Sequence, residues 1–356
     1  MQAKQEFNQP IHAFRGFAIL NIVVIHAFGF VFFLAESMEN PAESALMVLN
    51  WINSILFHDA TLYFTFISGI LFSMILQERG YVQFFKSKLN YVFLPYLFFT
   101  ALFTWRNWPF DGGAAVFFDG TVLQFVQVVG KNLLTGGAVF TLWYIPILLV
   151  LYVATPLFAK LLATKEAKWL NVAIILSPLI ISRVWPAISW TNYAYFLGAY
   201  LLGMYTGANY RLVIETVRRH AVLFIATAIG ASAVLVVLFI AEDPGWGVVR
   251  FTETAWYVQK IAISGLVLLW FERSITMVPR WLDVLGNYAF AIYFLHGYLL
   301  FEIYGLMVRA GLVLENAAVI IFWAIATYVG VIALSVLITV AAKTALRGKS
   351  RYFLGA

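Results

Sequence analysis

Long apolar stretches dominate the chain. A helix needs about 20 mostly apolar residues to cross a hydrocarbon core about 30 Å thick. Ten stretches approach or reach this length, and the third, fifth and sixth are short. They lie near residues 13–34, 57–76, 91–106, 140–162, 169–184, 193–207, 220–241, 255–271, 288–309 and 316–342. The pattern predicts an all-α, polytopic bundle of about ten transmembrane helices. A spanning barrel would instead show alternating segments of about 10 residues.

Basic residues gather on one side of this predicted bundle. With both termini in the cytoplasm, 16 of the 23 Lys and Arg residues fall in inside segments and 5 fall in outside segments. The remaining two, Arg15 and Lys260, lie within spans. Such an asymmetry is typical of cytoplasmic loops. It supports an even number of spans and two cytoplasmic termini.

The composition excludes several classes of protein. Hydrophobic residues make up 63% of the 356 residues and charged residues 11%, whereas soluble domains have about 25% charged residues. A soluble enzyme, a disordered chain and a fibrous protein are therefore excluded. The chain has no cysteine, which excludes thiolate metal sites and a cysteine acyl-enzyme. We expect no metal and no nucleic-acid partner, because the histidines are scattered and the basic excess lies on one membrane face.

We interpret residues 1–356 as a single membrane-embedded domain, with an N-terminal segment (1–12) and a basic cytoplasmic tail (343–356). The first apolar run is too long for the core of a signal peptide, so we expect it to be a span. In the longest connection, Ala114 to Phe118 and Val122 to Val129 are candidates for a short interfacial helix.

Two ionisable residues share the first span. Arg15 and His26 are eleven residues apart, which places them about 20° apart around a helix and about 16 Å apart along it. We therefore expect both to face one cavity, at different depths. Arginine near the inner mouth suits an anionic ligand, because its guanidinium binds phosphate as a fork. Histidine at depth suits proton transfer, because its pKa lies nearest neutrality. The alternatives are snorkelling of Arg15 to headgroups and an interhelical hydrogen bond from His26.

Other polar residues lie in or near spans. His296 should lie near mid-depth in the ninth span, either at the site or in a structural hydrogen bond. Glu302 is about 240° further around that helix and need not share its cavity. We expect Lys260 to snorkel outward. We interpret His58 and Asp59 as surface residues before the second span, because adjacent side chains do not face each other.

Five segments in order resemble the acyltransferase 3 family of integral membrane O-acyltransferases. The first span of that family carries an arginine, ten residues and a histidine, which Arg15 and His26 match. The segments are Ile11 to Leu20 running on to His26, Leu62 to Gly69, Phe85 to Leu89 with Leu94 to Tyr96, Leu142 to Pro146, and Leu285 to His296.

The resemblance implies transfer of an acyl group, usually acetyl, from cytoplasmic acyl-CoA to a hydroxyl of an extracytoplasmic saccharide or glycolipid. It also implies a multi-pass protein of the bacterial cytoplasmic (inner) membrane. His26 would be the general base, with an acyl-histidine relay as the variant, and Arg15 would hold the donor. Lys86 and Lys88 are candidate donor contacts, although the family often has arginines there. The candidates for substrate positioning are Ser68, Trp143, Tyr293 and His296.

This mechanism requires a polar passage from Arg15 to His26. One rival is a transporter or flippase for a lipid-linked saccharide or small solute, because the same buried charges suit proton relays. Another is a structural subunit, in which no buried ionisable residue matters. Release of free CoA from acetyl-CoA would distinguish an acyltransferase from the transporter.

Overall fold

The computed structural model describes residues 9–38, 42–107, 121–184, 189–274, 279–347 and 349–355, and these form helices and no strand. Short π and 3-10 turns join several of the α-helices. The α-helices are α2 (Gln9–Glu36), α3 (Glu43–Phe57), α4 (Thr61–Leu71), α5 (Tyr81–Lys88), α6 (Leu94–Asn107), α8 (Val122–Thr135), α9 (Tyr144–Ala163), α10 (Lys168–Leu176), α11 (Trp190–Ala208), α12 (Tyr210–Arg219), α13 (Ala221–Ile240), α14 (Phe251–Arg273), α15 (Arg280–Arg309), α16 (Ala317–Leu346) and α17 (Ser350–Leu354).

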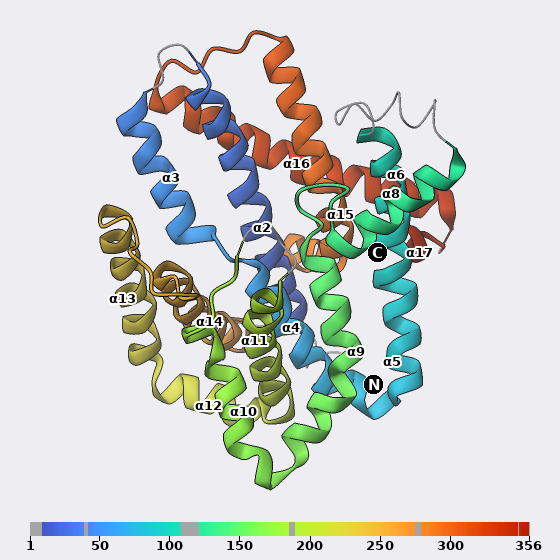
Figure 1. Cartoon of the computed structure of the whole chain (residues 1–356), viewed down its shortest axis with the longest axis vertical. Helices are drawn as coiled ribbons and strands as arrows, with labels where there is room; N and C mark the ends of the chain where they lie inside the picture. The colour runs from blue at the N-terminus through green and yellow to red at the C-terminus, as the bar shows by residue number, and fades with distance from the viewer. Residues whose placement is uncertain are drawn as a thin grey trace.

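The architecture is the predicted polytopic helical bundle (Figure 1). Seven helical stretches of the described residues are long and apolar enough to cross a membrane. The expected spans 91–106, 169–184 and 193–207 fall on α6, α10 and α11, which are not among the seven. The count of ten spans is therefore not confirmed. Of the expected interfacial helix, Val122 to Val129 lies within α8, and Ala114 to Phe118 lies outside the described residues.

The apolar stretch Glu43–Ile75 is broken near its middle, at residues 58–60. The sequence placed residues 35–56 in an outer loop, but α3 occupies much of this segment and runs beside α2 (Figure 1). The chain then turns at residues 58–60 before α4 begins. Asp59 in this turn adopts a left-handed φ of 62°, a conformation that is uncommon outside glycine. The break brings His58 and Asp59 from the expected surface into the bundle.

Helix α14 stabilises this break. Backbone groups at membrane depth need partners within the protein, and three side chains of α14 donate to the last carbonyls of α3. The bonds run from Trp256 Nε1 to Ser54 (3.0 Å), from Gln259 Nε2 to Ile55 (3.0 Å) and from Lys260 Nζ to Leu56 (2.8 Å). A cation at a helix C-terminus is also favoured by the helix dipole. The snorkelling expectation for Lys260 is wrong, because this residue is fully buried.

Glycines allow the closest helix contacts. A Cβ on Gly203 of α11 would lie 2.1 Å from the carbonyl oxygen of Phe66 in α4, and one on Gly286 of α15 would lie 2.2 Å from that of His12 in α2. Small residues of this kind let membrane helices approach backbone to backbone. Helix α2 thereby becomes a central element, packed against α3, α4, α14, α15 and α16.

Candidate active site

His26 lines a cavity of about 320 Å³, which we call the His26 cavity. Its wall comes from α2, the turn between α3 and α4, the loop before α9, the loop before α11, α14 and α15. Many small-molecule sites have volumes of about 300–1,000 Å³. The cavity is therefore large enough to admit a small ligand to the imidazole.

The two predicted span histidines lie together. The ring centroids of His26 and His296 are 5.6 Å apart, and Phe140 meets His26 edge-on at 5.1 Å. His296 Nδ1 lies 2.7 Å from the carbonyl oxygen of Tyr293, so it must carry the proton and donate. Its Nε2 is then a lone-pair acceptor, and it is buried with no hydrogen-bond partner among the described residues. The backbone of α15 thus sets the tautomer of His296.

Two other predicted positioning residues, Trp143 and Tyr293, line the His26 cavity. The hydroxyl of Tyr293 donates to the carbonyl of Thr141, in the loop that carries Trp143. That loop can pack on α15 because residue 297 is glycine, where a Cβ would lie 2.2 Å from Thr141 Oγ1. Tyr293 therefore holds one wall of the cavity in place.

Ser68 lies elsewhere. It belongs to α4 and is buried, and its hydroxyl is 3.2 Å from the hydroxyl of Tyr152 in α9. It does not line the His26 cavity. The structure therefore does not bring Ser68 to His26, and its contact joins two helices.

A buried ionic cluster forms another wall of the His26 cavity. Arg183 Nε lies 3.0 Å from Glu253 Oε2 and 3.3 Å from Asp59 Oδ1. The same guanidinium donates to His58 Nε2, and the hydroxyl of Tyr195 donates to Asp59. Burial opposes the charge of Arg183, but the carboxylates of Asp59 and Glu253 outweigh this effect and raise its pKa. The cluster therefore keeps a fixed positive charge between two carboxylates.

Sequence reasoning missed this cluster. The surface interpretation of His58 and Asp59 is wrong, because both line the His26 cavity and the Asp59 side chain is fully buried. Arg183 and Glu253 fall in two other expected outside segments, far from His58 along the chain. The one available signal was that all four residues stand within a few positions of an apolar run. The break between α3 and α4 contains neither proline nor glycine to mark it.

Arg15 lines a second cavity, of about 430 Å³, which we call the Arg15 cavity. Lys88, Lys343 and Arg351 also line it, and none of its described lining residues is acidic. The guanidinium carbon of Arg15 lies 5.7 Å from the ring centroid of Phe290. Lys86 is exposed and does not line this cavity. Four cations, with no acidic residue among the described lining residues, make a site suited to a polyanion.

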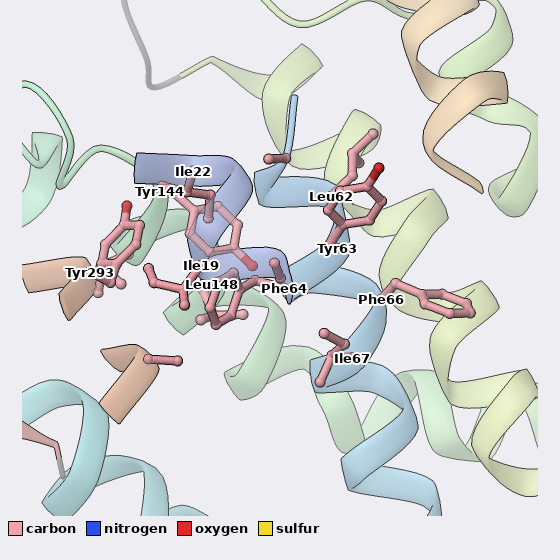
Figure 2. Packing of buried hydrophobic residues seen from close by; sticks show 14 of the residues in the cluster. Ile19, Ile22, Leu62, Tyr63, Phe64, Phe66, Ile67, Tyr144, Leu148 and Tyr293 are labelled. Carbon is pink, nitrogen blue, oxygen red and sulfur yellow. The ribbon is translucent and has the colours of Figure 1, made fainter. Parts of the chain in front are cut away.

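The Arg15 cavity and the His26 cavity are separate spaces. The cavities share no lining residue. Phe64 packs between them, with ring centroids 6.2 Å from Phe290 and 6.4 Å from Tyr293. Figure 2 shows Ile19 and Leu148 filling the same region. Phe64 is therefore a candidate barrier between the two cavities.

An apolar recess of about 340 Å³ adjoins the other side of His26. Gly29, Phe30 and Phe33 of α2 line it, together with residues of α15. His26 and Ile25 line both this recess and the His26 cavity. The imidazole therefore stands where a polar and an apolar space meet.

The fold and these cavities define a multi-pass membrane protein that holds basic and polar side chains between its helices. The chain belongs to the acyltransferase family whose model is described as an acyltransferase domain, and this model matches residues 8–341. It is similar to a protein named as a membrane-bound acyltransferase, YfiQ from Bacillus subtilis (strain 168). The two are 23% identical over 335 residues, which cover 90% of this chain and 88% of that protein. No solved structure matches the chain at a significant level.

The family assignment makes the chain an acyltransferase that transfers groups other than aminoacyl groups. The resemblance noted in the sequence is therefore confirmed, as is the helical membrane architecture. The roles of Arg15, His26 and the other site residues stay predictions.

Proposed function

We propose that the protein transfers an acyl group, acetyl first of all, from cytoplasmic acyl-CoA to a hydroxyl of an extracytoplasmic saccharide or glycolipid. One observation carries this proposal: helix α2 presents Arg15 to a basic cavity and His26 to a second cavity. The two residues stand on one continuous helix, about 16 Å apart along its axis. The donor would bind around Arg15, and the acceptor would meet it at His26.

The Arg15 cavity suits the donor. CoA is a polyanion, and the four basic side chains of this cavity would attract its phosphates. Arg15 can hold a phosphate with two parallel hydrogen bonds, which a lysine cannot do. The excess of basic residues in the predicted cytoplasmic segments supports binding from that side.

The His26 cavity suits the transfer step. The acceptor hydroxyl oxygen attacks the thioester carbonyl carbon, and His26 takes the hydroxyl proton as general base. The tetrahedral intermediate then collapses, the carbon–sulfur bond breaks, and the CoA thiolate takes the proton back from the imidazolium. His296, 5.6 Å away between ring centroids, and Tyr293 would position the reacting groups.

The test measures free CoA released from acetyl-CoA by the purified protein. We expect His26→Ala to lower this rate by about 10²- to 10⁴-fold, the usual contribution of a general base. His220→Ala is the matched control, because His220 is exposed and lines neither cavity. Turnover of His26→Ala at the wild-type rate would remove His26 from the chemistry. A wild-type protein that releases no CoA would contradict the proposed function and favour a transporter.

A further inference from the structure

The two cavities differ in charge. The Arg15 cavity is lined by four cations and by no described acidic residue. Among the described residues, the charged side chains that line the His26 cavity are those of Asp59, Glu253 and Arg183, so these residues give one net negative charge when the histidines are neutral. The two substrates of one reaction would therefore meet surfaces of opposite sign. This difference in charge would favour anionic ligands in the Arg15 cavity and disfavour them in the His26 cavity, because like charges in poorly hydrated sites repel strongly.

The members of the ionic cluster divide into two kinds. The Asp59 side chain is fully buried, where Tyr195 and Arg183 hold it. It stands in a left-handed turn, and backbone strain of this kind persists only where the surrounding structure enforces it. Asp59 and Tyr195 therefore have a structural role in the cluster, and they fix the position of Arg183.

Glu253, His58 and Arg183 are the more accessible members. Their side chains are 13%, 31% and 13% exposed, and all three line the His26 cavity. Glu253 Oε1 lies 3.9 Å from His58 Nε2, too far for a hydrogen bond. An ionised carboxylate accepts up to about four hydrogen bonds, and Arg183 Nε engages the other oxygen, Oε2. Glu253 therefore keeps acceptor capacity on the side of the cavity.

We propose that Glu253 and His58 bind hydroxyl groups of the acceptor and make the site select an uncharged saccharide over an anionic one. A sugar hydroxyl donates to the Glu253 carboxylate, and a hydroxyl oxygen accepts from His58 Nδ1, because His58 Nε2 already accepts from Arg183. A carboxylate or phosphate on the acceptor would meet the net negative charge of the cluster, in which the carboxylates of Asp59 and Glu253 outnumber the one guanidinium of Arg183, and would be repelled. This inference rests on the proposed function, because it assigns the acceptor side of the same site.

The experiment uses two probe acceptors, octyl β-glucoside and its carboxylate analogue octyl β-glucuronide, with labelled acetyl-CoA and the full-length protein. We expect wild type to acetylate the glucoside at least about tenfold faster than the glucuronide, because the gain or loss of one charged contact changes binding by about this factor. Glu253→Gln keeps the shape and removes the charge. It should raise the KM for the glucoside about 10- to 100-fold, narrow the discrimination between probes, and leave the KM for acetyl-CoA unchanged.

Glu302→Gln is the matched control, because Glu302 also pairs with an arginine at 3.0 Å but lines neither cavity. His58→Gln is a second variant, outside any helix, and should shift the glucoside KM in the same direction. Equal use of both probes by wild type, no acetylation of the neutral probe, or parallel changes in both KM values would overturn the inference. Loss of the His26-dependent CoA release would instead overturn the proposed function.

Discussion

At the residue scale, each buried ionisable side chain has its own surroundings. Lys260 donates to Leu56 and to Gln259 Oε1, so its amine completes the end of a helix. Arg183 lies between two carboxylates. Arg15 has no carboxylate within 4 Å in the described chain, and His26 borders open space on two sides. Charges at membrane depth are costly and mark function, so unpaired Arg15 is the better candidate for binding an external anion.

A conservative variant tests that role of Arg15. Arg15→Lys keeps the charge and loses the fork, so we expect the KM for acetyl-CoA to rise about tenfold, the loss of roughly one charge-assisted hydrogen bond. Steady-state CoA release at several acetyl-CoA concentrations measures it. Arg106→Lys, at a residue that pairs with Glu302 outside both cavities, should leave the KM unchanged. An unchanged KM in Arg15→Lys would favour snorkelling to headgroups.

Part of the site was predictable from sequence. Arg15 and His26 lie on one helix, as predicted, but they line two separate cavities where one was expected. His296 could be named as a candidate because it stands inside a span. The ionic cluster was not predictable, because its members come from separate segments. His58 and Asp59 meet Arg183 and Glu253 only once α3 stops short, and nothing local in the sequence marks that stop.

At the element scale, the length of the apolar stretches predicted most of the long helices. The positions of the remaining helices depend on how they pack against their neighbours. Helix α3 is not predicted, because the second span is expected to begin near residue 57 and the residues before it to form an acidic outer loop, although Glu43–Ile75 forms one apolar helical stretch. Helix α10 has only 9 residues and α11 carries several polar side chains, so neither forms a convincing span alone. Helix α11 is instead held against α4 through glycine contacts. The close approach of the two helix backbones fixes the position of α11, and amino-acid composition alone does not reveal such a contact.

These contacts predict that a Gly→Ala substitution has different effects on stability at two glycines. Gly203→Ala puts a methyl group against the Phe66 backbone, and overpacking of this kind costs about 1–3 kcal/mol. Gly230→Ala on α13 meets nothing within 4 Å, and alanine in a helix is favoured by about 0.5–1 kcal/mol. Thermal unfolding in detergent should show a lower midpoint for the first variant and an unchanged or higher one for the second. Equal midpoints would contradict the close packing of α4 and α11.

At the scale of the whole molecule, charge and packing divide the bundle into two compartments along α2. The basic compartment lies at the N-terminal end of α2 and also contains residues near the C-terminus of the chain. The other compartment holds the histidines and the ionic cluster. The proposed reaction needs the thioester carbon, bound in the first compartment, to reach an imidazole in the second. The aromatic packing of Phe64 against Phe290 and Tyr293 is therefore a candidate barrier to the donor.

A smaller side chain at this barrier should make the opening easier. Phe64→Leu removes the ring that contacts both Phe290 and Tyr293, while it keeps an apolar side chain in a buried site. We expect CoA release without acceptor to rise several-fold, because the thioester would reach the His26 cavity more often and meet water there. Phe99→Leu is the control, because Phe99 is as buried as Phe64 but its ring stacks on Phe294, which lines neither cavity. Equal rates in the two variants, at matched unfolding midpoints, would mean that the donor reaches His26 by another route.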